Sequence, residues 1–301
     1  MLSTHHLVFI EVAKEKSFSK ASQVLFISQP AVSKHVKYLE EYYKTKLFER
    51  KSTQIELTVA GALLLKRLLF VKNIQEETEF EISSLGDLVE AKGLLKLGAS
   101  TTVALYILPK VLSSFQKQYP QLEISLLNRN SETVLEALLN QEINLGIIEG
   151  HGKLTNVIYH PFINDKVIAV CGKNSLIAKK KKYRVKEIVN MPVALRERGS
   201  GTLAALKYAL EKNKIRINDL KVKARLGGTE ALKNYLIESD CLGFLPQRSV
   251  LKELKHNELA EVFFEDLHIE RDFYFILRKG ETSELNKKFI RFAGNMYNKQ
   301  L

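Results

Sequence analysis

The chain has 301 residues, of which 45% are hydrophobic and 27% charged, and its formal net charge is +12. This length allows two or three domains with sizeable hydrophobic cores. The positive charge favours a polyanionic partner without establishing one. No apolar run reaches the ~18 residues needed to span a bilayer, and the N-terminus lacks signal-peptide features. We therefore expect a cytoplasmic protein that does not enter membranes.

The cysteine content limits redox and metal chemistry. Cys171 and Cys241 are the two cysteines of the chain and lie far apart in the sequence. They provide no disulfide framework and no paired-cysteine metal motif. We expect reduced thiols packed as small apolar side chains, and a redox sensor is the alternative. The histidines show no zinc spacing, so no metal and no other cofactor is predicted.

Three helical patterns open the chain. Residues 3–16 place apolar side chains at helical spacing, and Ser19 can cap a second, short helix. Ser28 can cap a third helix, and Pro30 falls in its first turn, where a missing N–H costs little. The predicted buried face of this third helix consists of Val32, Val36 and Leu39.

The opposite face of the third helix is polar. Two short helices joined by a tight turn form a helix-turn-helix, whose second helix enters the major groove of DNA. Glutamine can contact adenine through two hydrogen bonds, and alanine can meet a thymine methyl, whereas lysines suit phosphates. A solvated face of an ordinary helical bundle is the alternative. The candidate DNA contacts in this helix are Gln29, Pro30, Ala31, Ser33, Lys34 and Lys37.

A hairpin and a long helix follow. Residues 46–58 have polar residues between two β-prone ends, which predicts a small wing. From Thr58 to about Leu85 the pattern predicts one long helix with a heptad seam. We expect this helix to pair with a second copy of the chain, and packing on the chain's own C-terminal domain is the alternative. The seam consists of Leu64, Leu68, Val71, Gln75, Thr78, Ile82 and Leu85.

Beyond residue 90 predicted strands and helices alternate, which indicates βαβ units and a mostly parallel sheet. The helix at residues 131–141 is expected to start at a Ser131 cap. At the end of the first strand, hydroxyls and helix N-terminal amides can hold an anion, and helix capping alone is the alternative. The candidate ligand contacts there are Ser100, Thr101 and Thr102.

A second ligand-binding loop is predicted at residues 195–202. Its glycines allow close approach of the backbone, its hydroxyls precede a helix, and an arginine, Arg196 or Arg198, could pair with a carboxylate, phosphate or sulfate. A simple turn with a helix cap is the alternative. The candidate contacts of this loop are Arg196, Gly199, Ser200, Gly201 and Thr202.

Other functions are weaker interpretations. Ser200 lies between two glycines, but no neighbouring His or Lys pattern supplies an activating base, so we do not expect an enzyme. A ligand-binding module whose N-terminal helices serve only assembly would have no DNA affinity. The basic run at 179–186 suggests a nucleic-acid contact, and a solvated loop explains it equally well.

The segment Phe9–Gly61 resembles the winged helix-turn-helix of LysR-type transcriptional regulators. The resemblance rests on the ordered motifs SFSKAS, SQPAVSKHVKYLE, LFER and LTVAG. It extends over the whole chain and implies an α+β multi-domain protein. The implied domains are a winged helix-turn-helix at 1–58, a linker and dimerisation helix at 59–89, and a two-lobed effector domain like periplasmic binding proteins at 90–301.

One departure from the family pattern lies at the wing tip. Many members carry an arginine there for the minor groove, whereas this wing has Arg50, Lys51, Ser52, Thr53 and Gln54. Lys51 is the candidate substitute.

The resemblance also implies how the effector domain is divided. Lobe I would comprise 90–163 and 269–301 and lobe II 164–268, with crossovers near Asn164 and His268. The effector cleft would lie between the lobes, and Glu149 would face it.

The function implied by the resemblance is ligand-dependent regulation of transcription. A homodimer or homotetramer would bind an inverted repeat in double-stranded DNA, respond to a small molecule and contact RNA polymerase. The loop at 195–202 and the motif GGTEALK with Thr229 look like the branch that includes regulators of sulfur assimilation and carbon fixation. That branch often has proline where Arg198 stands and arginine where Leu203 stands. The predicted effector is a small anionic metabolite.

Overall fold

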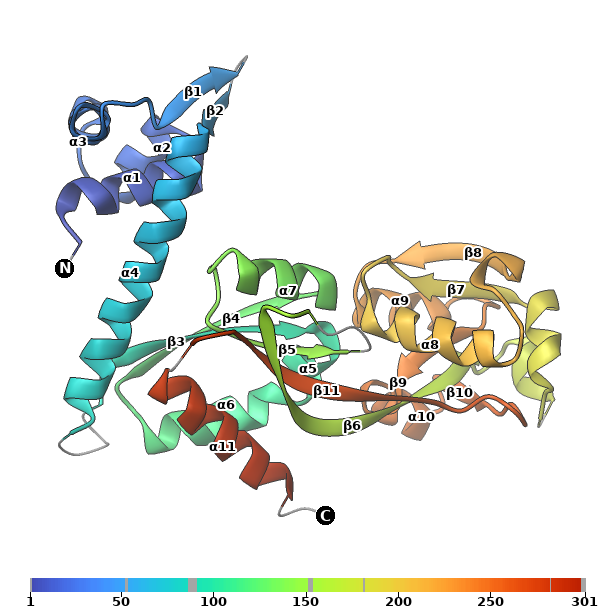
Figure 1. Cartoon of the computed structure of the whole chain (residues 1–301). Coiled ribbons are helices and arrows are strands. Elements are labelled where there is room, and N and C mark those ends of the chain that lie inside the picture. The colour runs from blue at the N-terminus through green and yellow to red at the C-terminus, as the bar shows by residue number, and fades with distance from the viewer. Residues whose placement is uncertain are drawn as a thin grey trace. The chain divides into compact units, whose positions relative to one another are not determined.

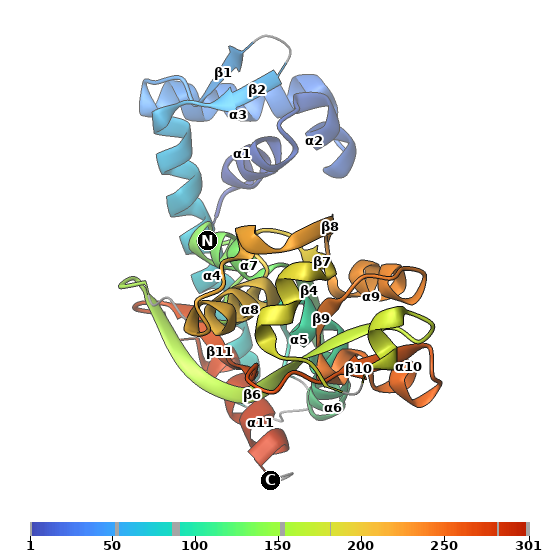
Figure 2. The same ribbon diagram turned by 90° about the vertical axis from the view of Figure 1, so that its right-hand side faces the viewer.

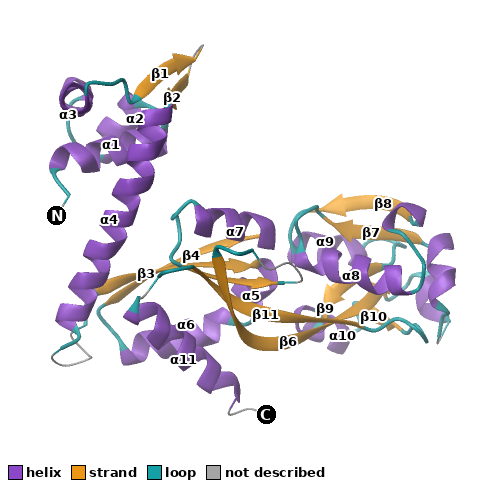
Figure 3. Ribbon diagram, in the orientation of Figure 1, coloured by secondary structure: helices purple, strands orange, loops and turns teal. Residues whose placement is uncertain are grey.

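The computed structural model describes residues 2–51, 54–85, 91–150, 154–180, 182–281 and 283–298. The chain divides into two compact units, Met1–Asp87 and Leu88–Leu301, which are described separately (Figures 1 and 3). The domain limits expected at 58/59 and 89/90 stay a prediction. The elements of the first unit are α1 (Thr4–Glu15), α2 (Phe18–Val24), α3 (Gln29–Tyr43), β1 (Phe48–Lys51), β2 (Gln54–Leu57) and α4 (Val59–Ser83).

The first three helices form the predicted three-helix core. Val32, Val36 and Leu39 of α3 are buried as expected. The cap of α2 differs from the prediction, because Ser17 and not Ser19 accepts a hydrogen bond, from the Lys20 amide at 3.2 Å. The helix starts earlier than predicted, at Phe18.

The start of α3 and the wing agree with the sequence. The Ser28 hydroxyl accepts a hydrogen bond from the Ala31 amide at 3.4 Å, and Pro30 lies in the first turn. Strands β1 and β2 pair antiparallel, from Phe48 opposite Leu57 to Lys51 opposite Gln54. The predicted helix-turn-helix and hairpin are therefore both present.

Helix α4 is a single long helix, but its predicted seam is not one continuous exposed stripe. Leu68 is buried against Phe9, Leu39 and Leu47 of the same unit, and Leu64 packs against this cluster. The first part of α4 is thus needed to close the core of the first unit. The exposed large apolar side chains of α4 and the residues after it are Val59, Leu63, Phe70, Val71, Ile74, Ile82 and Leu85.

The second unit is a mixed α/β structure that extends to α11. Its first half contains β3 (Gly93–Ser100), α5 (Thr101–Tyr106), α6 (Leu108–Gln118), β4 (Leu122–Arg129), α7 (Ser131–Leu139), β5 (Leu145–Glu149), β6 (Val157–Gly172), η2 (Leu176–Lys179) and η3 (Val185–Asn190). Its second half contains β7 (Pro192–Arg196), α8 (Gly201–Lys212), η4 (Ile217–Asp219), β8 (Lys221–Leu226), α9 (Thr229–Ile237), β9 (Gly243–Pro246), η5 (Gln247–Ser249), α10 (Leu251–Lys255), β10 (Leu259–Val262), β11 (Ile269–Arg278) and α11 (Glu284–Asn298).

The main sheet has the strand order β10-β6-β11-β5-β3-β4, with β9 also paired to β6. Strand β3 pairs parallel with β4 and β5, whereas β6 pairs antiparallel with β9, β10 and β11. The sheet is therefore mixed and not mostly parallel as predicted. The reason is that two long strands, β6 and β11, run side by side and carry the chain between the two ends of the unit (Figures 1 and 2).

Strand β11 separates two layers of core. Because successive side chains on a strand point to opposite faces, Phe275 and Ile276 enter different clusters. Phe275 meets the Phe289 ring of α11, with 6.5 Å between ring centroids, and Ile276 packs against Val134 of α7. Helices therefore cover both faces of this end of the sheet (Figure 1).

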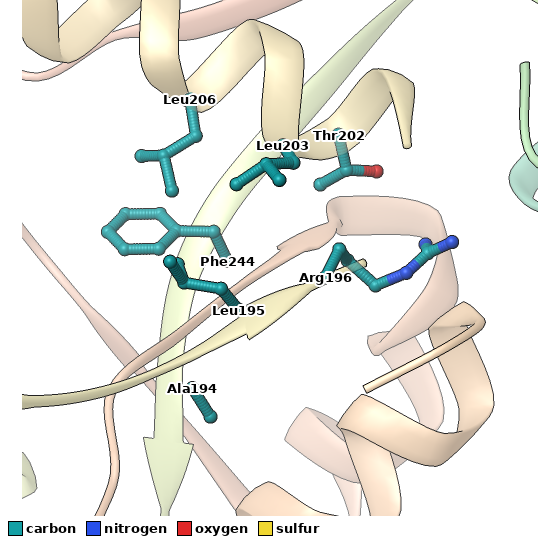
Figure 4. A pocket seen from close by; sticks show the side chains of 7 residues that line it. All are labelled: Ala194, Leu195, Arg196, Thr202, Leu203, Leu206 and Phe244. Atoms are coloured by element: carbon teal, nitrogen blue, oxygen red, sulfur yellow. The ribbon is translucent and has the colours of Figure 1, made fainter. Parts of the chain in front are cut away.

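At the other end, α8 covers β7 and β9. Leu195, Leu206 and Phe244 pack together between these elements. The side chains of Arg196 and Thr202 point away from this apolar contact, toward one common side (Figure 4). The packing of α8 on β7 thus fixes where two of the predicted ligand contacts lie. Among the described residues, no helix combines the length and the apolar character needed to cross a membrane.

Candidate functional sites

The predicted recognition face of α3 is open to solvent. Gln29 and Pro30 are exposed, and Ala31 and Ser33 are half-buried. The Gln29 side-chain amide donates a hydrogen bond to the Ser33 hydroxyl at 3.0 Å, so the two polar side chains orient each other before any partner arrives. The carbonyl oxygen and the second amide proton of Gln29, and the hydroxyl proton of Ser33, remain for base edges.

The cations of this face are exposed too. Lys34 and Lys37 project into solvent, and the Lys37 ammonium lies 3.6 Å from the Glu41 carboxylate. Lys51 belongs to β1, but its side chain falls outside what the structure describes, as do Ser52 and Thr53. Its predicted role at the wing stays a prediction.

A groove separates α3 from the hairpin. It is lined by Ser33 and Lys37 of α3 and by Phe48, Glu49 and Ile55 of the wing, among others, and has a volume of about 350 Å³. The wing is fastened to α3 through Glu40, whose carboxylate accepts a hydrogen bond from the Leu47 amide at 2.9 Å and pairs with Lys46 at 2.8 Å. The hydrogen bond to Glu40 raises the pKa of Lys46.

The second candidate site is a small polar pocket in the second unit. The volume open to the centre of a water-sized sphere is about 10 Å³, which is room for about one water molecule. Seven of the ten predicted effector contacts line it, whereas Gly199, Thr202 and Thr229 do not. Its lining residues are Ser100, Thr101, Thr102, Asn130, Ser131, Glu149, Arg196, Ser200 and Gly201.

One residue that the sequence analysis missed organises this pocket. The guanidinium of Arg271, on β11, is buried and pairs with Glu149 at 2.7 Å and with Asp165 at 2.7 Å. It also donates to the hydroxyls of Thr102 at 2.9 Å and Thr202 at 2.8 Å. Together with the bond from Nε to Asp165 at 3.0 Å, all five N–H groups of this arginine have partners.

The Arg271 bonds connect both sides of the pocket. Thr102 lies on α5 and Thr202 on α8, and the two helices come from segments far apart in the sequence. The same two sides also meet where the Glu132 amide donates to the Gly199 carbonyl at 3.4 Å and the Tyr106 hydroxyl donates to Glu230. The pocket is therefore spanned by a hydrogen-bond network centred on the two long strands.

Arg196 forms a second buried cluster beside the pocket. Its guanidinium donates to the Glu197 carboxylate at 2.7 and 2.9 Å and to the Thr229 hydroxyl at 2.9 Å. These three bonds leave two of its five N–H groups for a ligand. Burial of Glu197 works against its charge, but the bonds to Arg196 prevail and lower the Glu197 pKa. Thr229 does not line the pocket, but its hydroxyl holds the Arg196 guanidinium in place.

The two glycines of the loop have specific reasons to be glycine. Gly199 has φ +82, a conformation that side chains with a Cβ rarely adopt. At Gly201 a Cβ would collide with the Glu149 carboxylate. The Glu149 side chain therefore occupies the space beside Gly201 where the sequence predicted a ligand.

The hydroxyl of Ser100 differs from the other hydroxyls discussed above in its hydrogen bonding. Ser100 is 2% exposed, precedes α5 without capping it, and its Oγ has no hydrogen-bond partner among the described residues. A buried hydroxyl without a partner costs stability. The cost is recovered if a ligand supplies the partner.

The predicted cap of α7 is wrong. Asn130, not Ser131, caps this helix, because the Asn130 side-chain oxygen accepts from the Thr133 amide at 3.0 Å. Ser131 instead donates to Glu149. Arg198 is exposed, and its carbonyl accepts from the Asn130 side chain at 3.4 Å.

The remaining sequence features take ordinary structural roles. Cys171 and Cys241 are free and buried, and burial raises the pKa of Cys171 to about 11, which disfavours the redox-sensor interpretation. In the basic run, Lys180 pairs with Glu187 at 2.6 Å and Lys182 with Glu265 at 3.5 Å. Lys181 lies outside the described residues.

Comparison with known proteins identifies the family. Residues 4–62 match the family model for bacterial regulatory helix-turn-helix proteins of the lysR family, and residues 89–297 match the LysR substrate binding domain. The chain belongs to the LysR family. It is a DNA-binding transcriptional regulator with an effector-binding domain, as the sequence predicted.

Curated LysR-family relatives span nearly the whole chain. The HTH-type transcriptional regulator CysL of Bacillus subtilis is 30% identical and covers 97% of each chain. The HTH-type transcriptional activator CmpR of Synechocystis is 28% identical and covers 91% of this chain and 88% of its own. These relatives confirm the predicted family branch, and their names as transcriptional regulators support the expectation that the chain is not an enzyme.

Solved LysR-family structures share the fold. The crystal structure of CbnR is 17% identical, covers 97% of this chain and 98% of its own, and has a TM-score of 0.70. The regulatory domain of Synechocystis CcmR, solved in complex with 2-PG, is 24% identical, covers 67% of this chain and 96% of its own, and has a TM-score of 0.61. The predicted fold class, a winged helix-turn-helix followed by a binding-protein-like effector domain, is confirmed.

One feature of the sequence could have identified Arg271, which the sequence analysis missed. Strand β11 alternates, and Arg271 occupies the same buried face as Ile269 and Phe273. A charged residue at an apolar phase of a strand needs a partner, so the alternation alone marks Arg271 as paired. Its partners Glu149 and Asp165 come from other strands, and no local pattern identifies them.

Proposed function

We propose that this LysR-family regulator binds an inverted-repeat operator through α3 of two copies and responds to a small anionic effector in the pocket around Ser100 and Arg196. The exposed face of α3, with Gln29 and Ser33 oriented by their mutual hydrogen bond, supports base readout in the major groove. Lys34 and Lys37 would neutralise phosphates, and Lys51 would read the minor groove.

Self-association would supply the two-fold symmetry of an inverted repeat. The exposed apolar side chains of α4, Phe70 and Ile74 among them, support pairing through this helix as a homodimer or as half of a homotetramer. A crystal structure of CbnR with its target DNA complex has the same fold as this chain. A regulator of this kind works in the cytoplasm, where the chromosome lies, and contacts RNA polymerase.

The effector would be small and negatively charged. The single observation that carries this assignment is the buried Ser100 hydroxyl, which lacks a hydrogen-bond partner among the described residues and lines a small pocket together with Arg196. Hydroxyls and a guanidinium donate hydrogen bonds to oxyanions. Because the pocket has room for about one water molecule in this structure, the effector would enter as the two sides of the pocket separate. The CcmR regulatory domain, solved in complex with 2-PG, supports a small-molecule effector for the second unit.

The charged side chains around the pocket restrict the charge that the effector can carry. Arg271 pairs with Glu149 and shares Asp165 with Arg248, and Arg196 pairs with Glu197. All five N–H groups of Arg271 have partners, so the remaining donors for an anion come from Arg196, Ser100 and Ser200. Because Glu149 also lines the pocket, a highly charged anion would be repelled. An effector with a single negative charge fits this arrangement best.

The effector would act by shifting the equilibrium between two arrangements of the lobes. Hydrogen bonds from Arg271 to Thr102 and Thr202 span the pocket, so a ligand that strengthens or breaks them changes the relation between the helices that flank it. A ligand shifts such an equilibrium only by its difference in affinity for the two states, and a ~100-fold preference is about 2.7 kcal/mol.

Two measurements on the full chain test this function. Binding to duplex DNA is expected to weaken steeply as salt rises, because cations on phosphates release counterions. Sulfate, phosphate and short carboxylates are then added singly, and one of them is expected to raise the melting temperature and to change the operator affinity. DNA affinity that is negligible at low salt, or a melting temperature that no small anion raises, contradicts the corresponding half of the proposal.

A further inference from the structure

Phe26 occupies an unusual place in the turn between α2 and α3. Its side chain is 94% exposed and its φ is +53. The Phe26 amide donates to the Gln23 carbonyl at 3.3 Å and the Ile27 amide to the Ser22 carbonyl at 3.1 Å. This pair of bonds is a Schellman motif, whose left-handed position is usually glycine and sometimes asparagine.

Both properties of Phe26 cost stability. A side chain with a Cβ is strained in the left-handed region. An aromatic ring that stays in water contributes no hydrophobic stabilisation to the fold. The other non-glycine residues with positive φ in the described part of the chain are polar and suit solvent. Phe26 is the one apolar member of this set, which comprises Lys16, Phe26, Lys44, Gln141, Lys214 and Asn257. Folding alone gives no reason for phenylalanine at this position.

The location of Phe26 indicates a partner. It lies two residues before Ser28, the cap of α3, and the first turn of this helix is the part that approaches base edges in a helix-turn-helix. The exposed neighbours Val24 and Ile27 extend the apolar patch. The segment 16–39 contains four lysines and neither aspartate nor glutamate. An apolar patch in a segment whose charged residues are all lysines fits a nucleic-acid backbone, whose sugars are apolar and whose phosphates are anionic.

We propose that Phe26 is a DNA-contacting residue whose ring packs on the deoxyribose groups at the edge of the major groove. The left-handed backbone turns the ring outward, toward the duplex. This proposal rests on the proposed docking of α3 in the major groove. Since the contact is apolar and neutralises no phosphate, it strengthens binding to every sequence alike and leaves the salt dependence unchanged.

The test uses the full chain and a mixed-sequence duplex of about 30 base pairs, with affinity measured by fluorescence anisotropy at several salt concentrations. Phe26→Gly and Phe26→Asn remove the ring and suit the left-handed backbone. Both are expected to raise Kd about tenfold, the loss that corresponds to half or more of the burial of one aromatic side chain. The slope of log Kd against log salt is expected to stay that of wild type.

Stability separates this role from a structural one. Because asparagine tolerates φ +53 better than phenylalanine does, Phe26→Asn is expected to melt at or above the wild-type temperature while it binds DNA less well. Phe26→Tyr keeps the ring and is expected to keep the wild-type Kd. Lys214→Gly makes the same kind of left-handed replacement in the second unit, at φ +61, and is expected to leave Kd unchanged.

The outcomes separate this inference from the proposed function. Wild-type binding together with an unchanged Kd for Phe26→Gly and Phe26→Asn overturns the role of Phe26 alone. A melting temperature of Phe26→Asn several degrees below wild type overturns it too, since the ring then serves the fold. A wild-type chain that binds no duplex even at low salt overturns both proposals.

Discussion

Arg271 and Asp165 lie directly opposite each other on the two long strands, and their side chains form a buried ion pair with 2.7 Å between Nη2 and Oδ2. Both side chains are 1% exposed. A buried charge needs a partner of opposite sign, so this pair joins the strands that carry the chain between the two ends of the second unit. The same guanidinium reaches Glu149, Thr102 and Thr202.

Replacing Arg271 by methionine is expected to destabilise the second unit strongly. The variant leaves the buried Glu149 carboxylate without its cation, and Asp165 keeps only its pair with Arg248 at 2.7 Å. Breaking a buried ion pair in this way costs about 3–5 kcal/mol. Urea unfolding of the full chain measures the loss. Arg225→Met, at an exposed position of β8, is the matched control and is expected to change stability by less than about 0.5 kcal/mol. Equal unfolding midpoints for the two variants would contradict the central role of Arg271.

Replacing Gln29 by alanine is expected to remove sequence discrimination. The variant loses a side chain placed to contact a base through two hydrogen bonds, which is worth about 1–3 kcal/mol of discrimination. Affinity for random DNA is expected to change little, and competition between operator and random duplex measures the ratio.

Lys34→Ala provides the contrast to Gln29→Ala. It is expected to weaken binding to all sequences and to reduce the salt slope by about one, because it removes one phosphate contact. If the two variants affect operator and random DNA in the same proportion, the division between base readout and phosphate contact is incorrect.

Replacing Ser100 by alanine is expected to keep or raise stability and to weaken the effector response. The variant removes a buried hydroxyl that has no partner in the ligand-free protein. Ser249→Ala is the control, because Ser249 is equally buried but donates to the Pro246 carbonyl at 2.6 Å. Loss of that bond is expected to cost about 1 kcal/mol.

Thermal unfolding of both serine variants, with and without the effector found in the anion screen, makes this measurement. A Ser100→Ala variant that loses as much stability as Ser249→Ala and still responds fully to the effector would exclude Ser100 as a ligand contact.

Acid is expected to weaken the Arg196–Glu197 pair. Burial opposes the charge of Glu197, but the bonds from Arg196 lower its pKa below the ordinary value of 4.5. A carboxylate with a lowered pKa stabilises the folded state fully above its unfolded pKa, and this contribution is lost as the pH falls through the folded pKa. The stability lost on Glu197→Gln is therefore expected to be constant above about pH 5.5, one unit above the ordinary value, and to shrink below pH 4.5.

Unfolding of wild type and Glu197→Gln over this pH range tests the sign of the effect. Glu123→Gln, at an exposed position of β4, is the control for the loss of one carboxylate. A difference between wild type and Glu197→Gln that grows as the pH falls would mean that the ion pair does not stabilise the fold.

Much of the first unit follows from neighbouring residues alone. The spacing of Val32, Val36 and Leu39, the Ser28 cap and Pro30 all act within a few residues of one another, so their pattern predicts α3 and its exposed face. Local patterns also have limits. Ser17 and Asn130 cap the two helices for which Ser19 and Ser131 were predicted. The exact first residue of a helix depends on how the helix packs in the core, which the neighbouring residues alone do not show.

The sequence by itself determined the family, the helices and hairpin of the first unit, the exposed face of α3 and most of the residues that line the pocket. Only the tertiary structure decided how the pocket is charged. Arg271 meets Thr102, Glu149, Asp165 and Thr202 through the register of β11 with β5 and β6 and through the packing of α5 and α8. These contacts join residues that are far apart in the chain, and a buried charge selects its partners by distance in space, which no local pattern of residues encodes.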